Sequence, residues 1–258
     1  MNFKDKLEKA IVENQSLLCV GLDPDPENPK SRNQFLFNKK IIDQTANLVC
    51  CYKTQIAFFA AAGLKGLTDL KKTINYIKTA YQMPVILDAK RGDVENTSQM
   101  YAKEAFDFFN ADAVTVNPYL GTDSLVPFFE RKERGVFVIT RTSNPGAVDF
   151  QDLKVGHVPL YLKIAQMVVR WNKKYSNVFL EIGATWPREI GILRKMAPSM
   201  PFLVAGIGAQ GGDLKSTLLN GLTRDGDGLI INASRSIIYA QHPALAAKNL
   251  RDEINKYR

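Results

Sequence analysis

The sequence alternates short apolar runs with longer amphipathic stretches, and this alternation limits the possible folds more than any other feature. The apolar runs begin near Leu17, Thr54, Pro84, Ala113, Gly135, Val178, Phe202 and Gly228. The amphipathic stretches predict helices over Leu70–Tyr81, Ser98–Phe109, Tyr161–Lys174 and Ala244–Tyr257. Short runs of strand length that alternate with patterns of period about 3.6 residues indicate repeated strand–helix units.

About eight such units in 258 residues fit a TIM (β/α)8 barrel, which typically has about 250 residues. No glycine- or proline-rich linker divides the units. We therefore expect an α/β fold with one barrel domain over residues 1–258 and a short N-terminal helix. A doubly wound open sheet also alternates strands and helices, but its first strand–helix turn usually carries G-x-G-x-x-G. The segment Gly21-Leu22-Asp23-Pro24 lacks that motif, which favours the barrel.

Polar side chains gather where the predicted strands end. They are Asp23, Lys53 with Gln55, Asp88 with Lys90, Asn117, Thr142 with Ser143, and Asn232 with Ser234 and Arg235. The active sites of TIM barrels are built at these strand ends and in the loops that follow them. Lys53 stands at the start of its apolar run, so we expect that strand to begin nearer Val49.

The third apolar run ends in charges of both signs, in the segment L-D-A-K-R-G-D over residues 87–93. Asp88 and Lys90 are two residues apart, so they point to the same face of a strand, and Asp93 follows a glycine. Three charges in an enclosed space cost several kcal/mol unless they are paired. Neighbouring carboxylates keep an ammonium protonated, so we interpret Lys90 as a general acid rather than a Schiff-base nucleophile. The alternative is a structural ion-pair network at the barrel rim.

Two further segments predict a phosphate site. A-G-I-G-A-Q-G-G over residues 205–212 includes Gly208 and Gln210, and S-R-S over residues 234–236 includes Arg235. Glycines let backbone N–H groups approach an anion at a helix N-terminus, and a guanidinium binds phosphate through two hydrogen bonds. The alternative is that the glycines only permit tight turns and Arg235 caps a helix.

Composition excludes several other classes of protein. The net charge of +8 comes from lysines spread along the chain, with no basic run interleaved with aromatic residues, so we expect no nucleic-acid partner. Two histidines without ligand spacing argue against a metal site. Three cysteines without C-x-x-C spacing predict a reduced, cytoplasmic protein. No apolar segment approaches the roughly 20 residues of a membrane span, and the N-terminus lacks a signal-peptide core.

Four blocks of sequence, in order, resemble the orotidine 5′-phosphate decarboxylase family. They are K-T-Q-I-A-F-F over 53–59, D-x-K-x-x-D over 88–93, G-A-T-W-P over 183–187, and the pair A-G-I-G-A-Q-G-G-D and S-R-S. The blocks extend from the second to the eighth predicted strand. The forms D-A-K-R-G-D and G-A-T-W-P are typical of the long-form branch of that family.

The resemblance implies the last step of de novo uridine 5′-phosphate synthesis: decarboxylation of orotidine 5′-phosphate, with neither metal nor organic cofactor. It implies that Lys90 donates a proton to C6 of the pyrimidine and that Asp88 lies beside the departing carboxylate. Lys53 and Asp93 would complete a Lys–Asp–Lys–Asp array. Asp93 and Thr97 would reach into the partner subunit's site, which implies a homodimer.

The resemblance also assigns substrate-binding roles. Asp23 and Lys53 would bind ribose hydroxyls, and Thr142 or Ser143 would lie near the pyrimidine. Gly208 and Arg235 would hold the phosphate. We further expect Gln210 and Asn117 to contact the substrate.

Two other functions compete with this interpretation. A magnesium-dependent sugar-phosphate lyase of the same barrel group would use Asp88 and Asp93 to hold a cation. Lys53 and the G-A-T-W-P block argue against that lyase. A basic nucleic-acid-binding scaffold is the third hypothesis, but the sequence contains no recognition motif for it.

Overall fold

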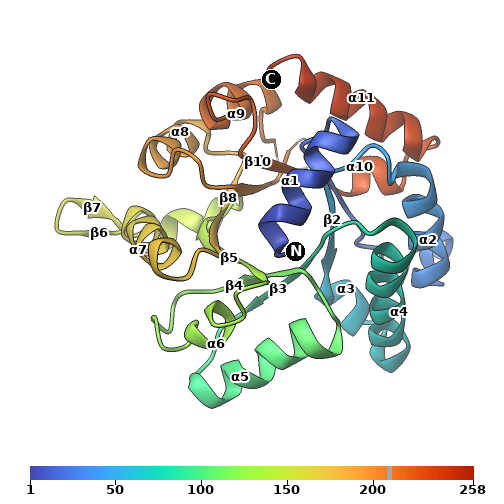
Figure 1. Cartoon of the computed structure of the whole chain (residues 1–258), viewed down its shortest axis with the longest axis horizontal. Helices are drawn as coiled ribbons and strands as arrows, with labels where there is room; N and C mark the ends of the chain where they lie inside the picture. The colour runs from blue at the N-terminus through green and yellow to red at the C-terminus, as the bar shows by residue number, and fades with distance from the viewer. Residues whose placement is uncertain (208–210) are drawn as a thin grey trace.

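Eight parallel strands close into a barrel, as the alternation of apolar runs predicts (Figure 1). The computed structural model describes residues 1–207 and 211–258. Around the barrel the neighbouring strands follow the order β1-β10-β9-β8-β5-β4-β3-β2. Their bounds are β1 Leu18–Gly21, β2 Cys51–Gln55, β3 Val85–Arg91, β4 Ala113–Val116, β5 Gly135–Arg141, β8 Val178–Gly183, β9 Phe202–Ala205 and β10 Leu229–Ala233. Parallel strands place their carboxyl ends at one rim, where the polar residues of the sequence are expected to meet.

The second strand differs from the apolar run that predicted it. β2 begins at Cys51, nearer Val49 as expected, but it ends at Gln55, and the residues Ile56–Ala60 form helix α3. The Gln55 side chain accepts a hydrogen bond from the Ala57 N–H and caps this helix. A short apolar run has no periodicity that separates a strand from a buried helix, and the predicted strand over Thr54–Phe59 was therefore wrong in its second half. The shift places Lys53 in the middle of β2.

Helices surround the barrel (Figure 1). The remaining helices are α1 Phe3–Asn14, α2 Gln34–Thr45, α4 Gly63–Tyr76, α5 Glu95–Lys103, α6 Val126–Phe129, α7 Leu160–Tyr175, α8 Pro187–Met196, α9 Leu214–Gly221, α10 Arg235–Ile238 and α11 Pro243–Asn255. Each of the four predicted helices is present. Two of them continue into a π-helical turn, over Ile77–Tyr81 and Glu104–Phe108. A short hairpin of β6 Lys154–Val155 and β7 Val158–Pro159 precedes α7.

Helix α1 closes the amino-terminal end of the barrel. Its capping box joins Asn2 and Asp5, and its first residue, Phe3, is 2% exposed. The Phe3 ring packs edge-on against Phe137 of β5, with 5.7 Å between the ring centroids. A Cβ at Gly135 would lie 2.4 Å from this ring, so only glycine lets β5 begin there. Because α1 covers the amino-terminal end of the barrel, the rim at the carboxyl ends of the strands is the open one.

Among the described residues, no helix combines the length and apolar character needed to cross a membrane. Cys19, Cys50 and Cys51 are buried and carry free thiols.

Candidate active site

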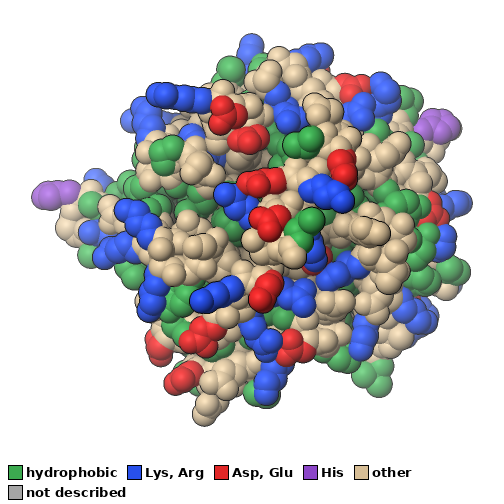
Figure 2. Space-filling view, viewed as in Figure 1, with side chains coloured by type: hydrophobic (Ala, Val, Ile, Leu, Met, Phe, Trp, Pro, Cys, Tyr) green, Lys and Arg blue, Asp and Glu red, His purple; other side chains and the backbone are tan. Residues whose placement is uncertain are grey.

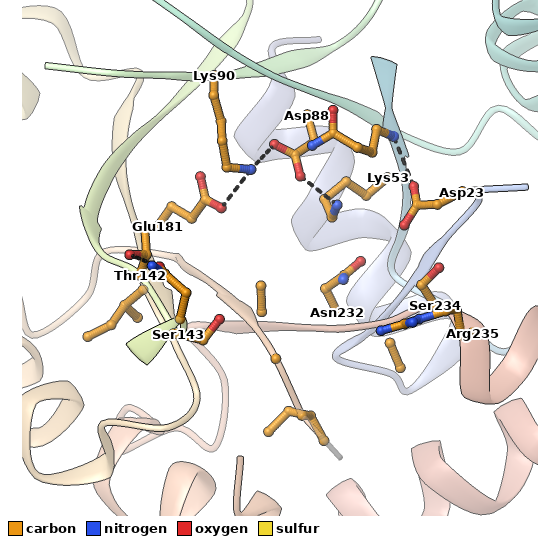
Figure 3. A pocket seen from close by; sticks show the side chains of 18 of the residues that line it. Asp23, Lys53, Asp88, Lys90, Thr142, Ser143, Glu181, Asn232, Ser234 and Arg235 are labelled. Carbon is orange, nitrogen blue, oxygen red and sulfur yellow. Dashed lines mark hydrogen bonds and ion pairs between the residues drawn. The ribbon is translucent and has the colours of Figure 1, made fainter. Parts of the chain in front are cut away.

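A cavity of about 480 Å³ opens at the carboxyl ends of the barrel strands. This volume falls within the range of about 300–1,000 Å³ that is usual for small-molecule sites. Figure 3 shows the side chains that point into it from several strands. Ten of the polar residues predicted at the strand ends line it: Asp23, Lys53, Gln55, Asp88, Lys90, Thr142, Ser143, Asn232, Ser234 and Arg235. These strand ends therefore meet at one cavity, and the roles of the residues stay predictions.

Two lysines and one aspartate form a continuous array at the floor of the cavity (Figure 3). Lys53 Nζ donates to Asp88 Oδ2 at 2.8 Å, and Lys90 Nζ donates to Asp88 Oδ1 at 2.5 Å. Lys53 and Asp88 are buried, whereas the Lys90 side chain is 38% exposed to the cavity. One carboxylate thus holds two ammonium groups, one inside the barrel and one at the position where a substrate can reach it.

Thr115 on β4 fixes the backbone of this array. Its hydroxyl donates to Asp88 Oδ1 at 2.8 Å and accepts from the N–H groups of Ala89 and Lys90, both at 3.0 Å. Lys90 adopts the left-handed conformation, with φ of 49°, and the register between β3 and β4 shifts at this point. Left-handed backbone at a residue with a side chain is strained, and such strain concentrates at functional sites. The bulge turns Lys90 toward Asp88 and the cavity.

The charges of the array stabilise one another's ionised forms. Burial alone would raise the pKa of Asp88, but Lys53 and Lys90 outweigh it and hold that pKa well below its usual range. Burial would lower the pKa of Lys53, but the charges of Asp88 and Asp23 raise it well above its usual range. Both groups are therefore ionised at neutral pH, as expected for oppositely charged neighbours in an enclosed site.

Glu181 is a cavity residue that the sequence analysis missed. It lies on β8, is 7% exposed, and its Oε1 is 3.6 Å from Lys90 Nζ. Burial raises the pKa of Glu181 to about 7; the charge of Asp88 also raises it, while Lys90 and Lys53 lower it. The signal in the sequence is a single carboxylate inside the apolar strand V-F-L-E-I-G. A buried acid of this kind is a candidate functional residue.

One side of the cavity is formed by β1 and β10. Asp23 follows β1 and accepts a hydrogen bond from the Gln55 N–H at 2.9 Å, which ties the end of β1 to the end of β2. Asn232 and Ser234, at the end of β10, also line the cavity. A Cβ at Gly21 would lie 2.8 Å from the Ser234 Cβ, so glycine permits β1 and β10 to approach here.

The opposite side is formed by the segment after β5. The Thr142 N–H donates to Gln151 Oε1 at 2.8 Å, and Trp186 Nε1 donates to the Thr142 carbonyl at 2.7 Å. A Cβ at Gly183 would lie 2.5 Å from the Ser143 backbone nitrogen. The G-A-T-W-P block is thus the surface against which the Thr142–Ser143 segment is held.

Of the residues predicted to bind phosphate, the structure describes Arg235. Arg235 begins α10 and lines the cavity, where its side chain is exposed. Ser234, the residue before it, has a buried hydroxyl with no hydrogen-bond partner among the described residues. Gly208 and Gln210 lie outside the described residues, so their predicted contacts stay predictions.

Three predicted residues do not line the cavity of this chain: Asp93, Thr97 and Asn117. Asp93 precedes α5, and one of its carboxylate oxygens accepts the Val94 N–H at 2.7 Å. Asn117 is exposed at the end of β4, where its N–H donates to the Arg91 carbonyl at 2.7 Å. The loops after β3 and β4 therefore lie beside each other, outside the cavity.

The chain is similar to known proteins over its whole length. Residues 16–250 match the model of the family described as "Orotidine 5'-phosphate decarboxylase / HUMPS family". The chain is 50% identical to the orotidine 5′-phosphate decarboxylase of Cellvibrio japonicus, over 100% of both chains. It is 44% identical to that of Thermomicrobium roseum, over 100% of this chain and 96% of the other. The structure of Leishmania donovani OMP decarboxylase is similar with a TM-score of 0.91 and 41% identity, over 100% of this chain and 99% of that chain.

The fold, the charged array and these similarities define a carboxy-lyase built on a TIM barrel. The chain belongs to the orotidine 5′-phosphate decarboxylase / HUMPS family.

Proposed function

We propose that this chain decarboxylates orotidine 5′-phosphate to uridine 5′-phosphate and CO2, with Lys90 as the proton donor to C6. The activity rests on the family and on the full-length relatives that bear this name. The Lys53–Asp88–Lys90 array is the observation that carries the assignment of roles, because it presents a paired, cavity-facing ammonium at the base of the site.

The reaction requires a group that stabilises negative charge. When the bond between C6 and the carboxylate breaks, its electron pair stays on C6, which has no adjacent electron sink. An ammonium held beside C6 stabilises this charge more in the transition state than in the ground state. Lys90 then transfers a proton from Nζ to C6, and CO2 leaves. Asp88 holds Lys90 in place and, in this assignment, lies beside the carboxylate that departs.

The remaining cavity residues fit the other parts of the nucleotide. Asp23 and Lys53 lie on the β1–β2 side, and we assign them to the ribose hydroxyls. Thr142 and Ser143 lie across the cavity, and we assign them to the pyrimidine. Arg235 supplies a guanidinium for the phosphate. In this assignment Gly208 and Gln210 contribute to the phosphate site. Asn117, which was expected to contact the substrate, lies outside the cavity and has no role in it.

We also propose that the enzyme works as a homodimer in which Asp93 and Thr97 complete the partner subunit's site. Both residues lie outside the cavity of their own chain. Large apolar side chains are exposed around them, on α5 and on the loops after β3 and β4; they are Val94, Met100, Tyr119 and Leu120. Exposed apolar side chains gathered on one part of a surface are typical of protein–protein interfaces.

Mixing two variants tests the shared site. Lys90→Ala and Asp93→Ala are each expected to be inactive alone. A mixed dimer contains one site in which both lesions meet and one intact site, so an equal mixture recovers about a quarter of the wild-type rate. No recovery after subunit exchange, or a monomer in sedimentation, contradicts the shared site.

The contacts of Asp88 argue against a magnesium-dependent lyase. Both of its carboxylate oxygens accept hydrogen bonds from ammonium groups, and Asp93, the second predicted ligand, lies outside the cavity. Magnesium prefers carboxylate oxygens that are free to coordinate it. The activity is therefore expected to be unchanged after dialysis against a chelator. Activity that is lost with the chelator and restored by magnesium refutes the cofactor-free mechanism.

The face of the molecule in Figure 2 does not favour a nucleic-acid-binding scaffold. On the face in Figure 2, Lys and Arg side chains alternate with Asp and Glu instead of forming one basic stripe. A binding surface for nucleic acid gathers its positive charge.

We place the enzyme in the cytoplasm, and the three buried free thiols support a reducing environment.

The central experiment follows the absorbance of the pyrimidine when the protein is mixed with orotidine 5′-phosphate. Lys90→Ala should lower kcat by about 10²- to 10⁴-fold, the usual contribution of a positioned general acid. Lys72→Ala, at an exposed lysine outside the cavity, is the matched control and should behave as wild type. A Lys90 variant as active as wild type refutes the assignment.

A further inference from the structure

Glu181 occupies an unusual position for a carboxyl group. Its side chain lies across the cavity from β3 and points toward Lys90 (Figure 3). On the neighbouring strands β5 and β9 the residues in register with it are Ile139 and Leu203, which offer no polar contact. Its Oε2 is buried and has no hydrogen-bond partner among the described residues. A buried polar atom without a partner costs about 1–3 kcal/mol, so its retention calls for an explanation.

The charges that face Glu181 come from two strands. Lys90 and Asp88 extend from β3, and Lys53 extends from β2. Arg141 at the end of β5 also lines the cavity, but its guanidinium is paired with Asp152. With Glu181 ionised, the two ammonium groups near it are balanced by two carboxylates. The array of this chain alone is therefore neutral before any substrate enters, and in the proposed homodimer Asp93 of the partner subunit adds one negative charge.

An anionic substrate disturbs this balance. In the proposed function the substrate carboxylate enters beside Asp88 and Lys90, and it adds one more negative charge to the array. A like charge favours the protonated form of its neighbour. Asp88 is held ionised by two direct hydrogen bonds from ammonium groups, whereas Glu181 has one ammonium near it in the described part of the chain, at 3.6 Å. Glu181 is therefore the carboxyl group that accepts a proton.

The position of this proton matters after the chemical step. Lys90 becomes a neutral amine when it gives its proton to C6, and it must regain a proton before the next turnover. Glu181 Oε1 is 3.6 Å from the same nitrogen, so a small rotation brings the carboxyl O–H within hydrogen-bond reach.

We propose that Glu181 takes up a proton when the substrate carboxylate binds, and passes that proton to Lys90 Nζ after Lys90 has protonated C6. The bond between C6 and the carboxylate breaks, and its electron pair accepts the Lys90 proton. The Glu181 O–H bond then breaks, Nζ regains its proton, and Glu181 returns to the carboxylate. One proton from solvent is consumed for each CO2 formed. Glu181 acts through Lys90 and does not touch C6, so it is a positioning residue that reloads the acid. This inference rests on the proposed function.

The timing of proton uptake tests the proposal. In a single turnover at about pH 8, in weak buffer with a pH indicator, wild type should take up its proton before the pyrimidine absorbance changes. Glu181→Gln keeps the shape of the side chain but cannot carry the proton, so its uptake should follow the absorbance change. Its steady-state kcat should fall about tenfold or more, while the rate constant of the first turnover stays within about threefold of wild type. At about pH 5.5 the early uptake should also disappear from wild type, because Glu181 is then already protonated.

Three further variants make the outcomes distinct. Glu181→Asp retains a carboxyl group and should keep the early uptake with a slower return of the proton to Lys90. Asp69→Asn, at a buried carboxylate of α4 outside the cavity, should match wild type. Early uptake in Glu181→Gln, or a first turnover slowed as much as kcat, overturns the proposal. Lys90→Ala separates the two levels: full activity in that variant refutes the proposed function itself.

Discussion

The buried carboxyl group of Glu181 should make the protein less stable as the pH rises toward neutrality. In the unfolded chain the pKa of this group has its ordinary value of 4.5, and in the folded protein burial raises it to about 7. Between these two pH values the folded state holds a proton that the unfolded state has released. The free energy of unfolding then falls by about 1.4 kcal/mol per pH unit, or about 3 kcal/mol in all. The stabilisation is complete below pH 4.5 and absent above about pH 7.

Urea unfolding of wild type and Glu181→Gln measures this effect. Glutamine does not titrate, so the difference in the free energy of unfolding between the variant and wild type should grow by about 3 kcal/mol from pH 4.5 to pH 8. Asp88 acts in the opposite direction, but its lowered pKa confines its contribution to pH values below its ordinary 3.8, outside this interval. Asp69→Asn is the control for loss of a buried carboxylate. If the free energy of unfolding changes with pH in the same way for wild type and Glu181→Gln, burial does not raise the pKa of Glu181.

Three further substitutions test other parts of the structure. Arg235→Ala should lower kcat/KM by about 10- to 150-fold, which corresponds to the free energy of one hydrogen bond to a charged group, and it should weaken the binding of inorganic phosphate. Arg224 is exposed and outside the cavity, so Arg224→Ala should change neither quantity. Phe3→Ala should lower the free energy of unfolding by about 3 to 5 kcal/mol in urea while KM stays the same, because the ring fills the closed end of the barrel. Asp88→Asn removes the carboxylate that is hydrogen-bonded to the buried Lys53 ammonium. The variant should be inactive, and its free energy of unfolding should fall by about 3 to 5 kcal/mol. A variant as stable as wild type would mean that Lys53 is neutral or hydrated.

The barrel could be predicted because its physical cause repeats along the chain. Each buried strand needs an apolar run and each covering helix needs an amphipathic one, so the count of units sets the architecture. The error at Thr54–Phe59 has the opposite cause. Where α3 follows β2 without a turn, the apolar residues that end the strand merge with those that start the helix, and only the Gln55 cap separates them.

The site could be predicted where charged residues are close in sequence, and not where closure of the barrel brings them together. Asp88 and Lys90 share one strand, so their meeting follows from strand geometry. Glu181 reaches Lys90 only because β8 and β3 face each other across the interior, with β4 and β5 between them along the wall. Asn117 was expected to contact the substrate, but it is exposed just after β4 and does not line the cavity.

The Thr115 hydroxyl couples the backbone at Lys90 to the carboxylate of Asp88. Thr115 donates to Asp88 and accepts from two backbone N–H groups, so its proton has one direction in which to point. The peptide shape at Lys90 and the direction of the Asp88 carboxylate are therefore set by a residue on another strand. A substitution of Lys90 therefore leaves in place the left-handed backbone that Thr115 holds at this position. Thr115, Asp88 and Lys90 share one set of hydrogen bonds, so the effects of substitutions at any two of them should not add.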